Sequence, residues 1–99
     1  MKISINGLNK AFDSRIRLGI MSSLAVNEVL DFNSLKEYLD LTDGNLASHL
    51  KALEKENYIS VRKSFIDRKP NTKYFMTKQG SKAFDEHLKV LENIIRKQK

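Results

Sequence analysis

The sequence predicts a mainly α-helical domain with one small β-hairpin, an α+β fold. Apolar residues recur at helical spacing from residue 8 to residue 53, alternate at a spacing of two from residue 58 to residue 77, and return to helical spacing from residue 81 to residue 97. The chain has 99 residues, of which 40% are hydrophobic and 30% are charged. This composition is typical of a folded protein, and we expect one domain, residues 1–99, with a single modest core.

The first helical segment carries an apolar side chain at every fourth residue, as the inward face of one helix or of two abutting helices would. Its five members are Leu8, Phe12, Ile16, Ile20 and Leu24. Asp13 or Ser14 can cap the start of a second helix. Residues 31–33 then predict a short link or a minimal strand.

Two short helices are predicted next, and together they make a helix-turn-helix over residues 34–57. Ser34 can cap the first, with Glu37 three residues further on. Its inward residues are Leu35, Tyr38 and Leu39. Asp40-Leu41 leads to the second helix, which Thr42 can cap and which should end near Asn57. The inward residues of the second helix are Leu46, Leu50 and Leu53.

Residues 58–77 predict two antiparallel strands, because apolar and polar side chains alternate there. We expect the turn around Pro70, inside a short basic tip at residues 67–73, and a second strand that begins at Lys73.

The last predicted helix, residues 81–97, has a wider apolar surface than a small core needs. One stripe consists of Phe84, Leu88, Leu91 and Ile95, and Val90 and Ile94 lie beside it. The surplus indicates a partner surface. The alternative is a terminal helix folded wholly onto its own domain.

The basic charge is concentrated in one part of the chain. The formal net charge is +6, and residues 58–78 hold six basic side chains against the single acidic Asp67. Residues 1–41 balance five basic against five acidic side chains. A local basic patch is typical of phosphate binding by nucleic-acid-binding proteins. A hairpin kept soluble by its lysines is the alternative.

Other classes of protein are disfavoured by what the sequence lacks. It has no cysteine, and therefore no disulfide and no thiolate metal ligand. No apolar run suits a signal peptide or the ~20 residues of a membrane span, so we expect a soluble cytoplasmic protein with no membrane partner. Isolated glycines, the lack of a cysteine nucleophile and the lack of carboxylates paired at a plausible spacing predict no catalytic site and no cofactor. The conceivable metal set Asp85-Glu86-His87 is weak, and we predict no metal site.

Three stretches of sequence, in the predicted order of elements, resemble a known family. They are residues 42–59 (TDGNLASHLKALEKENYI), the pair Arg68-Lys69 and residues 74–80 (YFMTKQG). The chain resembles winged helix-turn-helix transcriptional regulators of the MarR and ArsR type, particularly small single-domain bacterial and archaeal members. The resemblance implies a recognition helix that leads into a wing. Met76 stands where leucine is commoner, and Asn57 where glycine usually ends the helix, although Asn tolerates the left-handed backbone nearly as well.

Helical geometry gives the predicted recognition helix an outward face. Gly44 is small enough to allow close approach to a major groove. Asn45 and Ser48 can hydrogen-bond base edges, or they are ordinary solvated positions. Lys51 and Lys55 are better placed for phosphates.

The predicted wing adds basic side chains, and Arg68-Lys69 resembles the tip that many family members insert into a minor groove. Arg68 suits the negative potential of a narrow groove, and phosphate contact alone is the alternative. His49 falls beside the core stripe, so it either packs there or contacts DNA. The predicted DNA-binding residues are Thr42, Asp43, Gly44, Asn45, Ser48, Lys51, Lys55, Arg62, Lys63, Arg68, Lys69 and Lys73.

Related regulators pair through their first and last helices, and the surplus apolar surface agrees with a homodimer. The predicted interface residues are Leu8, Phe12, Phe84, Leu88, Leu91, Ile94 and Ile95. A two-fold dimer would present two recognition helices about 34 Å apart and read a pseudo-palindromic site on double-stranded DNA. We expect a repressor, with no identified small-molecule effector. The alternatives are a winged-helix protein-interaction module or an RNA-binding protein.

Overall fold

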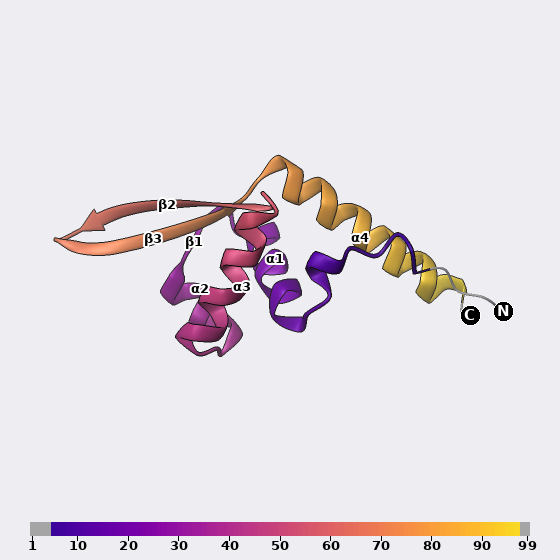
Figure 1. Cartoon of the computed structure of the whole chain (residues 1–99), viewed down its shortest axis with the longest axis horizontal. Coiled ribbons are helices and arrows are strands. Elements are labelled where there is room, and N and C mark those ends of the chain that lie inside the picture. Colours follow the sequence, from indigo (N-terminus) through magenta and orange to yellow (C-terminus); the bar gives the residue numbers. More distant parts are fainter. Residues whose placement is uncertain (1–4, 98–99) are drawn as a thin grey trace.

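The computed structural model describes residues 5–97, and within them helices form a body from which a β-hairpin and a long helix extend in opposite directions (Figure 1). In chain order the elements are η1 (Lys10–Phe12), α1 (Arg15–Val26), β1 (Leu30–Asp31), α2 (Phe32–Leu39), α3 (Asp43–Lys55), β2 (Ile59–Ile66), β3 (Lys69–Met76) and α4 (Lys78–Lys97). The predicted α+β class is confirmed, because helix-turn-helix, hairpin and terminal helix follow one another as expected.

The sheet is antiparallel, and its strand order is β1-β3-β2. β2 pairs with β3 along all eight of its residues. β1 has two residues and pairs with β3 only opposite Lys73 and Tyr74. Beyond these residues the hairpin is a two-stranded ribbon. We call the hairpin of β2 and β3 the wing, and residues 65–70 the wing tip.

One hydrophobic core joins the helices to the inner end of the wing. Its buried members are Phe12, Ile20, Met21, Leu24, Leu30, Leu35, Leu46, Leu50, Leu53, Ile59, Tyr74 and Phe84. The ring of Phe12 lies 5.4 Å from that of Phe84, centroid to centroid, in an edge-to-face arrangement. Because Phe12 is 1% exposed and Phe84 5% exposed, both belong to the core of one protomer. They can therefore support the predicted dimer interface only from beneath its surface, and their part in it stays a prediction.

Capping residues define where the first helices begin. Ser14 caps α1, and its Oγ accepts hydrogen bonds from the backbone N–H groups of Ile16 (3.2 Å) and Arg17 (3.3 Å). The predicted cap Ser34 was wrong: Asp31 caps α2, and its carboxylate accepts a bond from the N–H of Ser34 (2.8 Å). Such caps each stabilise a helix by about 1 kcal/mol.

The apolar face of α2 is narrower than predicted. Leu35 is fully buried, and Leu39 packs against Gly19 of α1, where an added Cβ would lie 2.9 Å from Leu39 Cδ2. Tyr38, expected to face inward, is exposed instead. The reason is that residues four apart share a helix face, and Leu35 and Leu39 already fill it.

A close junction fixes α4 against the end of α3. Asn57 has the left-handed φ of 63° that the sequence indicated, and its carbonyl accepts a hydrogen bond from Thr77 Oγ1 (2.6 Å). Thr77 Oγ1 also accepts a bond from the N–H of Gly80 (2.9 Å), and α4 begins directly after it, at Lys78. A Cβ on Gly80 would overlap the carbonyl of Tyr58.

The turn of the wing is tighter than predicted and lies elsewhere. The chain reverses at Asp67 (φ 52°) and Arg68 (φ 67°), two positive φ values that define a type I′ hairpin turn. The prediction of a turn around Pro70 was wrong, because Pro70 lies within β3 opposite Phe65. β1 does not reach this far, so β3 has a free edge there, where proline is tolerated.

Candidate nucleic-acid interface

The first turns of α3 present small and polar side chains. Thr42 caps the helix as predicted, and its Oγ1 accepts a hydrogen bond from the N–H of Asn45 (3.2 Å). Gly44, Asn45 and Ser48 are exposed. A Cβ added to Gly44 would meet nothing within 4 Å. This end of α3 can therefore approach a second surface closely.

Lys36 of α2 lies against the same end of α3 and was missed in the sequence. Its Nζ is 2.7 Å from Oδ1 of Asp43, a predicted DNA contact. The pair is solvent-exposed and adds little stability, but it offsets a negative charge that would repel phosphate. No helical spacing could reveal the pair, because the two residues lie on different helices.

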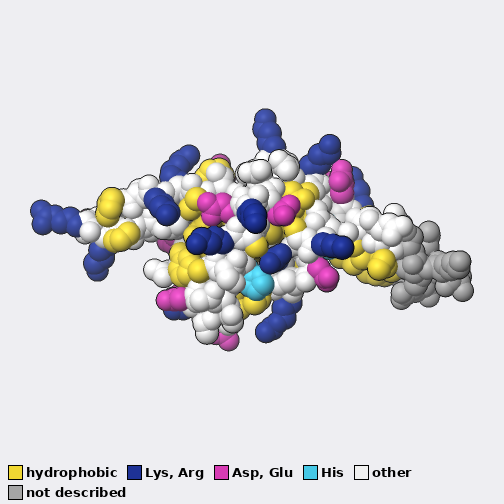
Figure 2. Space-filling model, in the orientation of Figure 1, with side chains coloured by type: hydrophobic (Ala, Val, Ile, Leu, Met, Phe, Trp, Pro, Cys, Tyr) yellow, Lys and Arg dark blue, Asp and Glu magenta, His cyan; other side chains and the backbone are white. Residues whose placement is uncertain are grey.

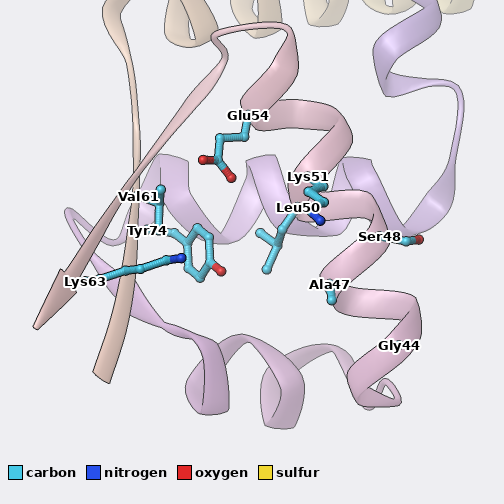
Figure 3. Close-up of a pocket in the computed structure, with 9 residues that line it drawn as sticks. All are labelled: Gly44, Ala47, Ser48, Leu50, Lys51, Glu54, Val61, Lys63 and Tyr74. Atoms are coloured by element: carbon cyan, nitrogen blue, oxygen red, sulfur yellow. The ribbon is translucent and has the colours of Figure 1, made fainter. Parts of the chain in front are cut away.

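An open groove of about 480 Å³ separates α3 from the wing (Figure 3). The α3 side is formed by Gly44, Ala47, Ser48, Leu50, Lys51 and Glu54, and the wing side by Val61, Lys63 and Tyr74. Figure 3 shows Lys63 extending from β2 toward the ring of Tyr74. The groove thus brings together four predicted DNA contacts, Gly44, Ser48, Lys51 and Lys63, with a lysine on each side.

Two polar groups in this groove, Tyr74 and Glu54, were not among the predicted DNA contacts. Burial raises the pKa of the Tyr74 hydroxyl, and the nearby Glu54 raises it further. The hydroxyl of Tyr74 is thus a hydrogen-bond donor in the groove that Lys51 and Lys63 also line. In the sequence Tyr74 is an ordinary strand residue and Glu54 a charged helix residue, so only their tertiary positions show that they share this groove.

Arg62 and Lys73 lie on the other face of the wing. They are opposite each other in the strand register, one position out of phase with Lys63, and side chains alternate between faces along a strand. The guanidinium of Arg62 lies 5.6 Å from the ring centroid of Phe75. Both residues border a second groove, of about 450 Å³, together with Glu28. The structure does not bring these two predicted contacts to the groove beside α3.

Lys55 is in the last turn of α3 and is exposed. The part of the chain that lines the groove ends at Glu54 on this helix. Lys55 therefore lies beyond the groove. Its contact with a DNA phosphate remains a prediction.

The wing tip combines charge with apolar surface. Arg68 and Lys69 are exposed at its end. Phe65 and Ile66, which precede the turn, are 76% and 49% exposed. Figure 2 shows basic side chains at the end of the wing with apolar side chains directly behind them.

His49 connects two helices rather than facing the groove. Its Nδ1 accepts a hydrogen bond from Nε of Arg17 on α1 (3.0 Å). Burial lowers the pKa of His49, and the charge of Arg17 lowers it further. Of the two roles left open for His49, the structure shows the packing role.

The outer half of α4 carries apolar side chains away from the core. Leu88 and Ile95 are exposed, and Leu91 and Ile94 are half-buried. Leu91 also lines an apolar groove of about 550 Å³ with Leu8 of the segment before η1. These five residues are the part of the predicted dimer surface that the core of the protomer leaves uncovered.

Two negative findings concern residues 5–97 only. Their His, Asp and Glu side chains include no group of three placed to hold a metal ion. Within the same range, no helix combines the length and apolar character needed to cross a bilayer.

Comparisons with known proteins agree with this architecture. An uncharacterized protein of Methanocaldococcus jannaschii is 40% identical over 79 residues, which cover 80% of this chain and 86% of that protein. A solved structure of a transcriptional regulator homologue from Pyrococcus horikoshii superposes with a TM-score of 0.83 at 32% identity, covering 89% of this chain and 87% of that one.

More distant structures share the fold. A putative transcriptional regulator of the MarR family from Enterococcus faecalis superposes with a TM-score of 0.74 at 21% identity, over 89% of this chain and 82% of that one. The family model described as winged helix DNA-binding domain matches residues 16–95. Because this match includes α3, the wing and most of α4, the chain belongs to the winged helix DNA-binding domain family.

Proposed function

We propose that the protein is a sequence-specific transcriptional regulator that binds a pseudo-palindromic site on double-stranded DNA as a homodimer. The observation that carries the proposal is the groove between α3 and the wing, which has Lys51 on one side and Lys63 on the other. A phosphate backbone lying along such a groove would have α3 in the major groove and the wing tip at the adjacent minor groove.

On α3, base reading is assigned to the first turns. Asn45 and Ser48 are exposed beside Gly44, whose open surroundings allow the helix to approach the floor of a major groove. Asparagine pairs best with adenine, and serine accepts or donates to any base edge. Lys51 follows one turn later, at the distance from the helix start where phosphates lie.

At the wing tip, Arg68 is the principal contact. It holds a positive φ of 67°, a conformation that costs a non-glycine residue about 1–2 kcal/mol. Strain of this kind is retained mainly where function needs the side chain. A guanidinium at the outermost point of a basic hairpin suits the negative potential of a narrow minor groove.

Dimerisation is assigned to the outer half of α4 and the segment before η1. Leu88, Leu91 and Ile95 form an apolar stripe that this protomer leaves exposed or half-exposed. A second copy related by a two-fold axis would bury that stripe against its own. The paired recognition helices would then read two half-sites about one DNA turn apart. Repression follows if such a site overlaps a promoter, because the bound dimer excludes polymerase.

The test is selection from a pool of random DNA duplexes, followed by affinity measurements at two salt concentrations. The Arg68→Ala, Lys69→Ala double variant removes two charges at the wing tip. The Lys89→Ala, Arg96→Ala double variant is its matched control, because it removes two exposed charges from α4.

We expect a two-fold symmetric motif to be enriched by the unaltered protein. The wing variant should weaken binding and reduce the slope of log affinity against log salt by about 4, because a homodimer loses two charges at each of its two wing tips, while the control changes neither. Absence of an enriched motif, or equal binding to double-stranded RNA, would refute the proposed function.

A further inference from the structure

Phe65 is an exposed aromatic side chain that takes no part in the core of residues 5–97. It is 76% exposed and lies one residue inside the end of β2. Its partner across the strands is Pro70. The pair next to a two-residue turn exchanges hydrogen bonds and the following pair does not, so Phe65 and Pro70 form a close, non-hydrogen-bonded pair. Their side chains make one apolar unit at the wing tip.

The strand register places this unit on the face of the wing that looks toward α3. Side chains at every second position share a face, so Phe65 follows Val61 and Lys63, both of which line the groove beside α3. Ile66 pairs with Lys69 and lies on the opposite face. The apolar unit therefore continues the surface that we assign to DNA.

The charges around Phe65 indicate the chemistry of the partner. Lys63 precedes it on the same face, Arg68 follows at the turn, and Lys69 begins β3 on the face of Ile66. An apolar protein surface would leave these three cations without partners. A DNA minor groove has phosphates along both rims and apolar sugar and base surfaces between them, which matches an apolar unit at the end of a basic hairpin.

We propose that Phe65, backed by Pro70, is an apolar wedge that enters the minor groove and partly unstacks one base step. The wedge rests on the proposed DNA binding and adds a second source of specificity. It would favour pyrimidine–purine steps such as TA and CA, because these unstack most easily, and it would bend the duplex toward the major groove.

The experiment begins with the duplex that the unaltered protein enriches from a random pool. One copy carries fluorophores at its two ends, to measure bending by energy transfer. Another carries 2-aminopurine at the step facing the wing, to report unstacking. Three variants are compared: Phe65→Ser, the conservative Phe65→Leu, and Ile66→Ser as a matched control on the opposite face. Phe65 and Ile66 are exposed, so circular dichroism should show all three variants folded.

We expect binding by the unaltered protein to bend the duplex by at least about 20° and to brighten 2-aminopurine. Phe65→Ser should lower affinity about tenfold, in line with the loss of one aromatic–base contact, and should abolish both signals. Phe65→Leu should keep most of the bending and of the 2-aminopurine signal. Ile66→Ser should match the unaltered protein in affinity and in both signals.

Two results would overturn the wedge while leaving the proposed function standing. One is an enriched motif that Phe65→Ser binds and bends as the unaltered protein does. The other is a Phe65→Ser variant that changes only the oligomeric state in sedimentation, which would assign Phe65 to contact between protein copies. Failure to enrich any motif would instead remove the proposed function, and the wedge with it.

Discussion

Arg68 has a backbone angle that lowers the stability of the fold and a side chain that we propose contacts DNA. Glycine is the residue that a type I′ turn favours at the second central position, yet this chain has arginine there with a φ of 67°. Asp67, at the first position, tolerates its φ of 52° better, because its short polar side chain suits the left-handed region.

We therefore predict opposite effects for Arg68→Gly. The variant should be more stable by about 1 kcal/mol, because the turn no longer strains a side chain, and should bind duplex DNA more weakly, because the guanidinium is gone. Urea unfolding and fluorescence anisotropy measure the two quantities. Asp67→Asn, which keeps the turn and the guanidinium, is the control. Lower stability of Arg68→Gly would contradict the strain argument.

Gly80 and Gly44 make a matched pair, because both lie in the first turns of helices and differ in their surroundings. We predict that Gly80→Ala loses about 2 kcal/mol or more of the free energy of unfolding, since its Cβ would overlap the Tyr58 carbonyl. Gly44→Ala should keep or raise stability by up to ~1 kcal/mol, since its Cβ meets nothing. Chemical denaturation measures the free energy of unfolding of both variants. Equal losses would refute the argument that the Tyr58 carbonyl leaves no room for a side chain at Gly80.

At the scale of elements, α4 has two halves with different roles. Phe84 and the buried His87 attach the first half to the core. The second half carries Leu88, Leu91 and Ile95 on the adjoining stripe, where Leu88 and Ile95 are exposed and Leu91 is half-buried. A helix of 20 residues is about 30 Å long, and α4 extends past the helical body (Figure 1). This geometry supports assembly through the outer half.

We predict that Leu88→Glu, Ile95→Glu produces a folded monomer. Carboxylates on the apolar stripe would be buried without partners in a dimer but solvated in a monomer. Asn93→Glu, exposed and about 160° around the helix from Ile95, should leave the dimer intact. Sedimentation velocity distinguishes the two outcomes, and a dimer that survives the double substitution would exclude this face as the interface.

At the scale of the whole molecule, two histidines hold separate segments together in their neutral form. His87 Nδ1 accepts a hydrogen bond from the N–H of Asn9 (3.0 Å), which ties α4 to the segment before η1. Burial lowers the pKa of His87 below its usual 6.5, against a smaller opposing effect of Asp13. His49 and Arg17 join α3 to α1 in the same way.

Acid should therefore weaken the fold before carboxylates titrate. As pH falls below 6.5, the unfolded chain takes up protons that the folded histidines resist, so stability is lost from that pH down toward the folded pKa values. Asp31, whose pKa is lowered from 3.8 by its hydrogen bonds with Ser34, acts only at lower pH. We predict a falling unfolding free energy between pH 7 and pH 5, and a flatter profile for His87→Gln. A flat profile in the unaltered protein would contradict this.

Local patterns in the sequence predicted the elements and their order, because helical spacing, strand alternation and the Thr42 cap are properties of neighbouring residues. The failures arose where a distant part of the chain decides the outcome. Pro70 marks turns in general, and only the absence of β1 beside it allows it in a strand.

The sequence predicted part of the candidate site, namely the residues that a local pattern identifies. Lys51 and Lys63 were identified from helix phase and charge, and the structure brings them to one groove. Alternation along the predicted strand already separated Arg62 from Lys63, but only the packing of the wing beside α3 decides which of the two faces the groove. Lys36 and Tyr74 reach the interface through tertiary packing, which no spacing within one helix or strand encodes.

The shortness of β1 has a consequence for motion. Beyond Lys73 the wing is a ribbon of two strands, and isolated ribbons of this kind are only marginally stable in water. The backbone amides of residues 62–72 should therefore exchange with deuterium through local opening, at a much lower free energy than those of α3, whose apolar face is buried. The wing would then reach DNA as a fluctuating arm. The rate at which the wing orders would set how many encounters with DNA become bound complexes.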